Sequence, residues 1–386
     1  MCAPSHWEPK RYGLDIRRPL ARVLDTIFPK TRAKLAQRLA RCLAADPLHV
    51  IDVGGALGPD PRWALFPANT IRFMTFEPDT RSHEQVSPSE QWNLALAIGL
   101  AGAAGEKKLH LTEAPFASSL YPPNEALLRD FSVWPWYRPA GEVIVAVDTL
   151  DGCLARHMDW RADFVKVDTE GADLDVLKGG RTALATAFGA QIEVSFLARN
   201  VGAPLQPQID LWLREEAFRP HLLIREHWVR ANGVHGALSR PQLAWADAVY
   251  FRERDWVVAR LATAPTPEEA EARLAAILAI LLAYGAHDYA ADIVSAARDA
   301  AVIEPEAADA AEWSVNASLT ALAPFAVRGA LAVLLALLIA APLALIGGRG
   351  RSAGRDLIAA QAGPLFDALS RAARRGGLKR TCLPDL

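Results

Sequence analysis

From residue 49 to residue 251 the chain alternates between short apolar runs and longer segments whose apolar positions have helical spacing. Short runs rich in Val, Ile, Leu and aromatic residues, bounded by turn residues, are typical of strands. The intervening segments 173–185 and 208–218 predict helices, so the pattern indicates βαβ units and a mostly parallel sheet covered on both faces. The predicted strands are HVIDV (49–53), IRFMTF (71–76), WNLALAI (92–98), KKLHL (107–111), VIVAV (143–147), DFVKV (163–167), AQIEV (190–194), HLLI (221–224) and DAVYF (247–251).

Helical patterns flank this region on both sides. Residues 14–45 contain apolar positions at helical spacing with Arg and Lys between them, which predicts an N-terminal helical cap over 1–47 or a basic helix on a membrane surface. We place the α/β domain at 48–255, followed by the Pro-containing linker TAPTP. Two amphipathic patterns then predict a helical hairpin over 266–304. This hairpin begins a C-terminal all-α region that extends to the end of the chain.

The segment 317–348 is a strongly apolar helical pattern, and its residues 329–348 contain no charged side chain. At about 1.5 Å per residue a helix of this length reaches across a bilayer core. The tail 349–386 has a basic helical pattern, and basic flanks prefer the cytoplasmic side. We therefore expect membrane attachment through 329–348, as a segment that dips into one leaflet at Pro342, with a true span and a buried helix as the alternatives.

Composition narrows the class of protein. The chain of 386 residues is 51% hydrophobic and 22% charged, which excludes a disordered or fibrous protein. Both ends are basic around an acidic body, and an acidic body argues against nucleic acid as a partner. The four cysteines form no C-x-x-C pair, which fits a reducing cytoplasm better than a disulfide framework.

The first predicted strand leads into a glycine-rich turn. In HVIDVGGALG (49–58) the apolar run contains Asp52, and Gly54, Gly55 and Gly58 follow it. Glycine lets the backbone turn tightly and approach a ligand without a Cβ in the way. Because open α/β sheets bind ligands beyond the carboxyl ends of their strands, this turn is a candidate binding loop. Its spacing differs from the dinucleotide fingerprint G-x-G-x-x-G.

Glu77 ends the second predicted strand. In doubly wound folds an acidic residue at this place accepts hydrogen bonds from ribose hydroxyls. Together with the glycine turn, which lacks the pyrophosphate-binding form, it favours an adenosine-type ligand without a diphosphate. The alternative is a solvated residue at a strand end.

A third group of polar residues lies in DFVKVDTEGADLDVLKGG (163–180). Lys166, Asp168 and Glu170 occupy alternate positions, so their side chains project to one side of the strand, and Glu193 interrupts another apolar strand. Charges are rarely buried without partners, so this pattern indicates a reactive site, with a structural Lys–carboxylate pair as the alternative. Carboxylates also suit Mg²⁺ or Ca²⁺, but no His ligand accompanies them and we assign no metal.

These segments resemble, in order and spacing, the FkbM family of S-adenosylmethionine-dependent methyltransferases. KVDTEGADLDVLKG is the most specific match. The resemblance implies a class I methyltransferase (Rossmann-like) α/β fold, with a mostly parallel seven-stranded sheet that has one antiparallel hairpin at its edge and helices on both faces. The matching segments are IDVGGALG (51–58), FEPD (76–79), NLALAIG (93–99), SSL (118–120), VDTLD (147–151), DFVKVDTEGADLDVLKGG (163–180), IEV (192–194) and ADAVYF (246–251).

The resemblance also implies a reaction, namely methyl transfer from S-adenosylmethionine to a hydroxyl oxygen of a sugar, a polyketide or a related small-molecule or glycan acceptor. It places the cofactor at Asp52, Gly54, Gly55 and Gly58, the ribose at Glu77, and adenine near the segment Asn93–Ile98. A hydroxyl acceptor gains from a general base, for which Asp168, Glu170 and Glu193 are the candidates, with Lys166 tuning them. The aromatic insertion 130–142 suits an acceptor pocket or a lid.

We weigh a second function of another class. The chain could be a non-catalytic, membrane-associated binding or scaffold protein that retains the methyltransferase fold. Retention of the glycine turn, Glu77 and the KVDTEG run favours the enzyme. Since the cofactor is made in the cytoplasm, we expect a cytoplasmic protein, attached to the cytoplasmic face of the inner membrane if 329–348 is an anchor.

Overall fold

The computed structural model describes residues 46–55, 58–82, 93–232 and 241–312, together with Leu43 and Val315. The predictions for nearly all of the N-terminal cap 1–47, for the apolar segment 317–348 and for the basic tail 349–386 lie outside the described residues. Within these described ranges, no helix combines the length and apolar character that a bilayer crossing needs.

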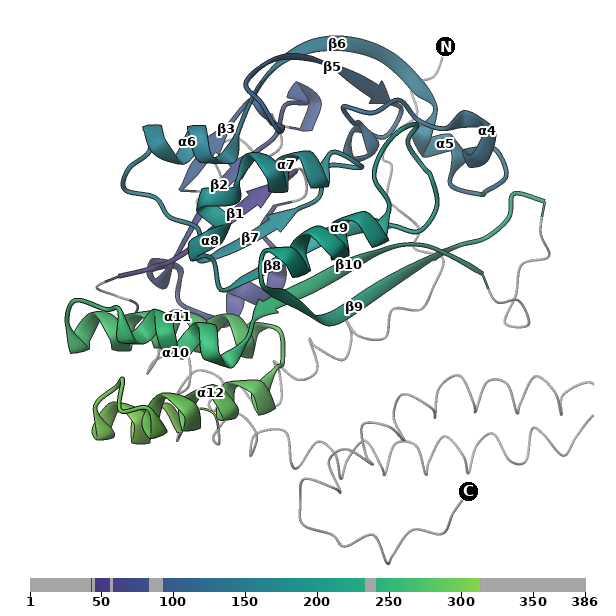
Figure 1. The fold of residues 1–386 in the computed structure, drawn as a ribbon. Helices are drawn as coiled ribbons and strands as arrows, with labels where there is room; N and C mark the ends of the chain where they lie inside the picture. The colour runs from purple at the N-terminus through teal and green to yellow at the C-terminus, as the bar shows by residue number, and fades with distance from the viewer. Residues whose placement is uncertain are drawn as a thin grey trace, which may run out of the picture.

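The central element is a seven-stranded sheet, as predicted (Figure 1). The strands β3, β2, β1, β7 and β8 are parallel, and β10 runs antiparallel to both β8 and β9. The hairpin β9–β10 therefore closes one edge of the sheet. In spatial order the strands are β3 (Leu94–Leu96), β2 (Ile71–Phe76), β1 (Leu48–Val53), β7 (Phe164–Val167), β8 (Gly189–Ser195), β10 (Gln242–Arg252) and β9 (Phe218–Trp228).

Two of the predicted strands leave the main sheet. β5 (Gly105–Thr112) and β6 (Pro139–Asp148) pair with each other, and the short β4 (Gly99–Leu100) completes a second, three-stranded sheet. This second sheet arches over one end of the main sheet (Figure 1). Most residues of β6 are exposed, so neither of its faces is marked as buried. Its sequence therefore did not show that it belongs to a second sheet.

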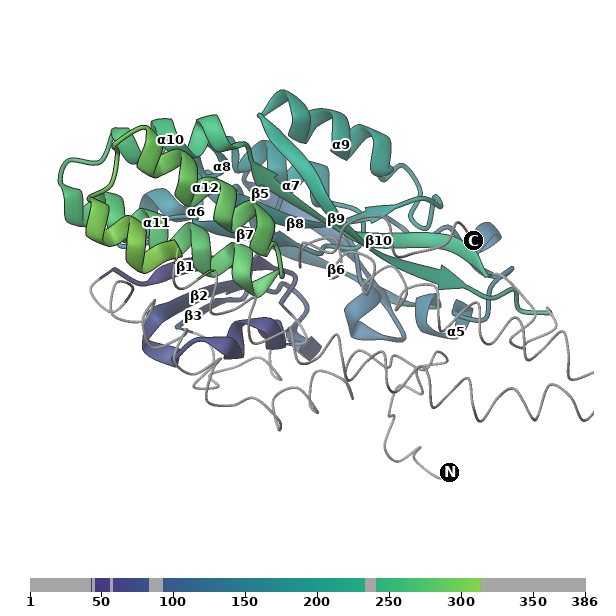
Figure 2. The same ribbon diagram turned by 90° about the horizontal axis from the view of Figure 1, so that it is seen from below.

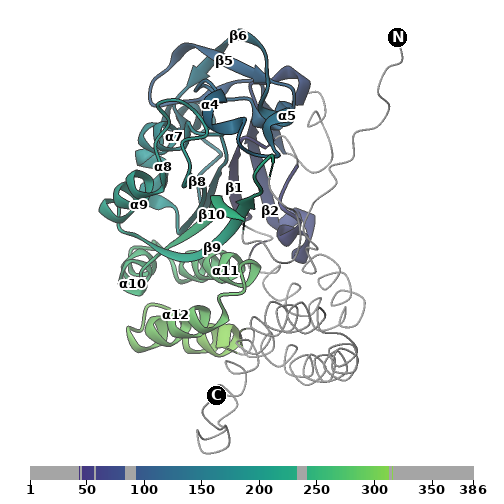
Figure 3. The same ribbon diagram turned by 90° about the vertical axis from the view of Figure 1, so that its right-hand side faces the viewer.

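Helices cover the main sheet on both faces. On one face α6 (Leu150–Arg156), α7 (Asp173–Gly179), α8 (Arg181–Thr186) and α9 (Gln206–Glu215) pack over an apolar core, and α7 to α9 line up along this face in Figure 3. On the other face α10 (Arg254–Ala262), α11 (Pro267–Ala283) and α12 (His287–Asp299) lie together (Figure 2). Other helices among the described residues include η1 (Pro61–Leu65), η2 (Ala68–Thr70), η3 (Pro115–Ala117), α4 (Glu125–Leu128) and α5 (Trp134–Tyr137).

The helices α11 and α12 share one core with the sheet. α11 begins at Pro267, where the Oγ1 of the N-cap Thr266 accepts a hydrogen bond from the Glu269 N–H at 3.2 Å. Tyr284, just after α11, donates from its hydroxyl to the Gln191 Oε1 on β8 at 2.8 Å. The sequence analysis did not predict α10, whose apolar positions begin at Trp256, directly after the predicted domain boundary at 255.

One face of the sheet changes character along its strands. Val50 of β1 and Phe164 of β7 lie in the apolar core shared with α11, in the amino-terminal half of the strands. Two residues further along, Asp52 and Lys166 are adjacent in register, and their side chains share that face. This face of β1 and β7 is therefore apolar in the amino-terminal half of the strands and charged at their carboxyl ends.

Candidate active site

The turn after β1 packs directly against the end of β7. Gly54 has φ +82°, a left-handed conformation that favours glycine, and its N–H donates to the Phe76 carbonyl at 2.9 Å. A Cβ on Gly54 would lie 1.9 Å from the carbonyl oxygen of Asp168. The requirement for glycine at this position therefore comes from backbone packing between two strand ends. Gly55 is buried, and Gly58 (φ +81°) donates its N–H to the Gly55 carbonyl at 3.0 Å.

Lys166 joins two carboxylates at this edge. Its Nζ lies 3.2 Å from the Asp52 Oδ1 and 3.2 Å from the Asp168 Oδ2. Burial raises the pKa of Asp52, and Lys166 acts against that shift. Burial also opposes the charge of Lys166, but the two carboxylates raise its pKa above the usual range. The three side chains therefore form a continuous charged row from β1 to β7.

Glu77 follows β2 and lies beside this row. Its side chain is buried, and its Oε1 accepts a hydrogen bond from the Asp79 N–H at 2.8 Å. Burial raises the pKa of this carboxyl to about 7. Asp79 in turn binds Arg81 at 2.6 Å and accepts from the Ser118 hydroxyl at 3.1 Å. The FEPD and SSL segments, 39 residues apart between Asp79 and Ser118, thus meet in the fold.

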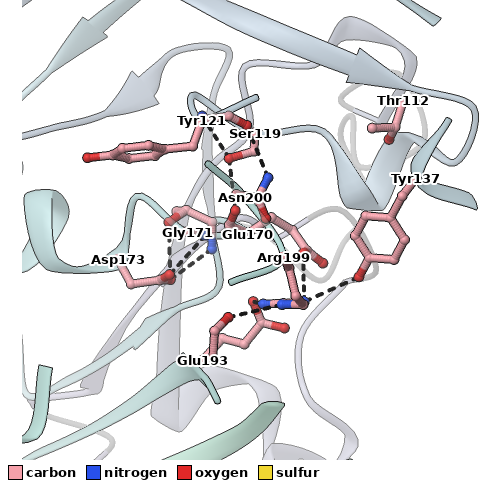
Figure 4. A network of polar contacts seen from close by, with 12 residues as sticks. Thr112, Ser119, Tyr121, Tyr137, Glu170, Gly171, Asp173, Glu193, Arg199 and Asn200 are labelled. Carbon is pink, nitrogen blue, oxygen red and sulfur yellow. Dashed lines mark hydrogen bonds and ion pairs between the residues drawn. The ribbon is translucent and has the colours of Figure 1, made fainter. Parts of the chain in front are cut away.

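The turn after β7 is strained and tightly bonded (Figure 4). Glu170 has φ +55°, a left-handed conformation that costs a non-glycine residue about 1–2 kcal/mol. Asp173 accepts from the N–H groups of Thr169 at 3.0 Å and Gly171 at 3.1 Å, and the Ser119 hydroxyl donates to the Glu170 carbonyl at 2.8 Å. Strain of this kind persists where surrounding contacts over-determine the backbone, as it does at active sites.

Arg199 lies at the centre of the polar network in Figure 4, with a side chain that is only 1% exposed. Its Nη1 donates to the Glu170 Oε2 at 2.9 Å and to the Tyr137 hydroxyl oxygen at 3.2 Å. Its Nη2 donates to the Glu193 Oε2 at 2.7 Å, and its Nε to the Ser195 Oγ at 3.0 Å. Burial raises the pKa of Glu170 and of Glu193, and Arg199 opposes the shift in both.

The sequence prediction missed two residues of this site. Arg199 lies in the loop after β8, and nothing in its neighbours SFLARN marks it. Asp247 of β10 is opposite Glu193 in the sheet register, and burial raises its pKa to about 7. Asp247 is the only charged residue in the predicted strand DAVYF, and this could have marked it as a site residue.

Three of the predicted catalytic carboxylates are close enough to hold a cation. One oxygen each of Asp168, Glu170 and Glu193 lies within 4.8 Å of the others, and carboxylates are the ligands that Mg²⁺ and Ca²⁺ prefer. Each already has a cationic partner in the protein, Lys166 for Asp168 and Arg199 for the two glutamates. We therefore assign no metal ion to them.

Asn93 lies away from the other predicted site residues. It precedes β3, and its Oδ1 accepts a hydrogen bond from the Phe73 N–H at 2.7 Å, in the middle of β2. The carboxyl end of β3 is at Leu96, whose carbonyl accepts from the Glu77 N–H at 3.1 Å. Asn93 thus stabilises the amino-terminal side of the sheet edge, and we leave it out of the site.

The aromatic insertion packs against one side of the Arg199 network. Tyr137 and Phe131 each lie 5.5 Å, between ring centroids, from Trp228, and the Arg199 guanidinium lies 5.9 Å from the Trp228 ring. Trp134 and Trp136 of α5 are half-buried at the surface of this cluster. The insertion is therefore joined to the site through Tyr137 and Arg199.

Comparison with protein-family models matches residues 52–220 to the methyltransferase FkbM domain. No curated protein and no solved structure matches the chain. The matched range includes the glycine turn, Glu77, the turn after β7, Glu193 and Arg199, and it ends in β9. Residues 52–220 are therefore similar to the methyltransferase FkbM domain.

Proposed function

We propose that this protein transfers a methyl group from S-adenosylmethionine to a hydroxyl oxygen of a small-molecule or glycan acceptor, such as a sugar, a polyketide or a related metabolite. One observation carries the proposal. Inside an FkbM domain, the glycine turn, Glu77 and the strained turn at Asp168–Gly171 converge at the carboxyl edge of a parallel sheet. That edge is where open α/β sheets bind their ligands.

The residues at this edge fit an adenosine-type cofactor. The left-handed glycines Gly54 and Gly58 place no side chain beyond the end of β1. The Asp79 N–H orients the Glu77 carboxylate through Oε1, and a carboxylate accepts with both oxygens, which suits the paired hydroxyls of a ribose. When bound, S-adenosylmethionine supplies an electrophilic methyl group on its sulfonium and leaves as a neutral thioether.

Asp168 is the best candidate for the general base. Its side chain is 35% exposed, whereas those of Glu170 and Glu193 are 10% and 3% exposed and bound to Arg199. A base must come within hydrogen-bond reach of the proton that it takes, and only the accessible carboxylate can do so without rearrangement. Lys166, 3.2 Å away, fixes the orientation of the Asp168 carboxylate through a charge-assisted contact. Asp168 then accepts the hydroxyl proton as the acceptor oxygen bonds to the methyl carbon.

The strained turn also bears on the non-catalytic alternative. Glu170 in a left-handed conformation and several buried carboxylates all cost folding free energy. A scaffold gains nothing from that cost, whereas an enzyme uses it to hold reactive groups in place. This favours an enzyme.

The test begins with calorimetric titration of S-adenosylmethionine into the full-length protein. We then expect Asp168→Asn to lower turnover by about 10²-fold with unchanged cofactor affinity, the size expected of a lost general base. Glu77→Ala should instead weaken cofactor binding. Asp255→Asn, at a side chain 95% exposed, is the matched control. Turnover is followed as the mass gain of one methylene unit in candidate acceptors. Absence of cofactor binding, or an Asp168→Asn variant as active as the wild type, would refute the proposal.

We also propose that the protein works in the cytoplasm and that residues 329–348 attach it to the membrane. The support is the uncharged stretch of bilayer-spanning length and the basic tail behind it. Fractionation after carbonate washing tests this. Deletion of 329–348 should move the protein to the soluble fraction, and full-length protein found there already would contradict the attachment.

A further inference from the structure

The chain buries two arginines in the described α/β region, and they have different partners. Arg199 binds two carboxylates at the carboxyl edge of the sheet, Glu170 at 2.9 Å and Glu193 at 2.7 Å. Arg252 is 4% exposed and donates only to backbone carbonyls, including Ala187 at 3.1 Å and Leu184 at 2.7 Å. Arg252 donates to backbone carbonyls at the end of α8, whereas Arg199 binds charged side chains beside the proposed base.

We propose that Arg199 is a positioning residue: it binds Glu170 and Glu193 as a fixed pair and so leaves Asp168 as the carboxylate that takes the acceptor proton. This inference rests on the proposed methyl transfer. It assigns Arg199 a role in selecting the base, not in touching the cofactor or the acceptor.

The geometry explains why an arginine is needed. Its planar fork reaches two carboxylates from one side chain, and its Nε is used by Ser195, so the guanidinium cannot rotate without losing bonds. The main chain of Arg199 is fixed as well, because its carbonyl accepts from the Asn124 N–H at 2.7 Å. Glu170, in its left-handed conformation, is therefore held at both its backbone and its carboxylate.

The charges around the pair show what removal would do. Three carboxylates with oxygens within 4.8 Å of one another repel, and burial raises the pKa of Glu170 and of Glu193. Arg199 opposes this shift in both glutamates, so its removal would raise their pKa values further. The titratable groups that surround Glu170 and Glu193 are Asp168 and Lys166 of β7 or its end, Asp173 of α7, Asp247 of β10, Tyr137 of α5 and Arg199 itself.

The experiment compares Arg199→Met with Arg199→Lys and uses Arg252→Met as the matched control, all in the full-length chain. Urea unfolding at pH 6 and pH 8 measures the equilibrium constant of unfolding, and it needs no methyl acceptor. A carboxyl that binds a proton only in the folded state changes this constant by up to about tenfold per pH unit. We expect Arg199→Met to be more destabilised at pH 8 than at pH 6 relative to the wild type, by up to about 10²-fold in the unfolding constant for each carboxyl. Arg252→Met should lose the same amount at both, and Arg199→Lys should keep the wild-type dependence because it keeps the charge.

Turnover supplies the second readout. With S-adenosylmethionine affinity unchanged, Arg199→Met and Arg199→Lys should both lower kcat by about tenfold or more, since neither side chain can hold both glutamates. A pH-independent loss of stability in Arg199→Met, equal to that of Arg252→Met, would overturn the inference, as would an unchanged kcat. Failure of the wild type to bind the cofactor would instead refute the proposed function, and the unfolding data would still decide whether Arg199 maintains the charge of the pair.

Discussion

Replacement of Glu77 by Gln should raise the stability of the protein while weakening its cofactor site. Glu77 is 7% exposed, and burial raises its pKa from 4.5 to about 7, with the charges of Asp79, Asp168 and Asp52 adding to the shift. Each pKa unit corresponds to about 1.4 kcal/mol, so ionised Glu77 costs the fold about 3 kcal/mol. Gln has nearly the same shape and can still accept from the Asp79 N–H.

The sign of the pH dependence is set by proton binding. Between pH 4.5 and 7 the folded protein retains the Glu77 proton while the unfolded chain has lost it, so stability falls as pH rises through this range. The penalty is absent below pH 4.5 and complete above pH 7. Glu77→Gln removes this titration, so its advantage over the wild type should grow from pH 5 to pH 8 towards about 3 kcal/mol.

Urea unfolding at pH 5, 6, 7 and 8 measures this difference, with the exposed Glu106→Gln on β5 as the control. Calorimetry at pH 8 should show weaker S-adenosylmethionine binding by Glu77→Gln, because the amide presents a donor where the carboxylate presents a second acceptor. A stability difference that stays constant over this pH range would refute the reasoning about burial. Unchanged cofactor affinity would remove Glu77 from the site.

Two further substitutions test the packing around the site by urea unfolding. Gly54→Ala should destabilise the protein far more than Gly285→Ala. Both glycines have a positive φ, which costs alanine about 1–2 kcal/mol. Only at Gly54 would the new Cβ clash with a backbone oxygen, whereas at Gly285 it meets nothing within 4 Å. Equal losses would contradict the packing of β1 against β7. Thr75→Val should stabilise the protein by about 1–2 kcal/mol, because the buried Thr75 hydroxyl has no hydrogen-bond partner among the described residues and Val has the same shape. A loss of stability would instead show that the hydroxyl has a partner, such as a bound water.

The sequence was sufficient for the main sheet and for part of the site. Apolar runs predicted the strands, and the two-residue period of a strand predicted that Lys166 and Asp168 project to one side, where they lie 3.2 Å apart. Parallel strands end at the same edge of a sheet, so residues after β1, β2 and β7 had to come close together. Each of these inferences needs only local periodicity and the direction of the chain, which the order of residues contains.

Only the tertiary structure decided the other features, because they depend on contacts between distant segments. Arg199 reaches Glu170 and Glu193 from a loop that has no periodicity, and no local pattern distinguishes it from a surface arginine. Gly54 is required by the carbonyl of Asp168, which lies on another strand, and Asn93 is held at the opposite end of its strand by Phe73. The second sheet formed by β5 and β6 is likewise settled by packing. A sequence specifies which side chains are available, whereas the pairing of buried charges depends on which segments the fold brings within about 3 Å of one another.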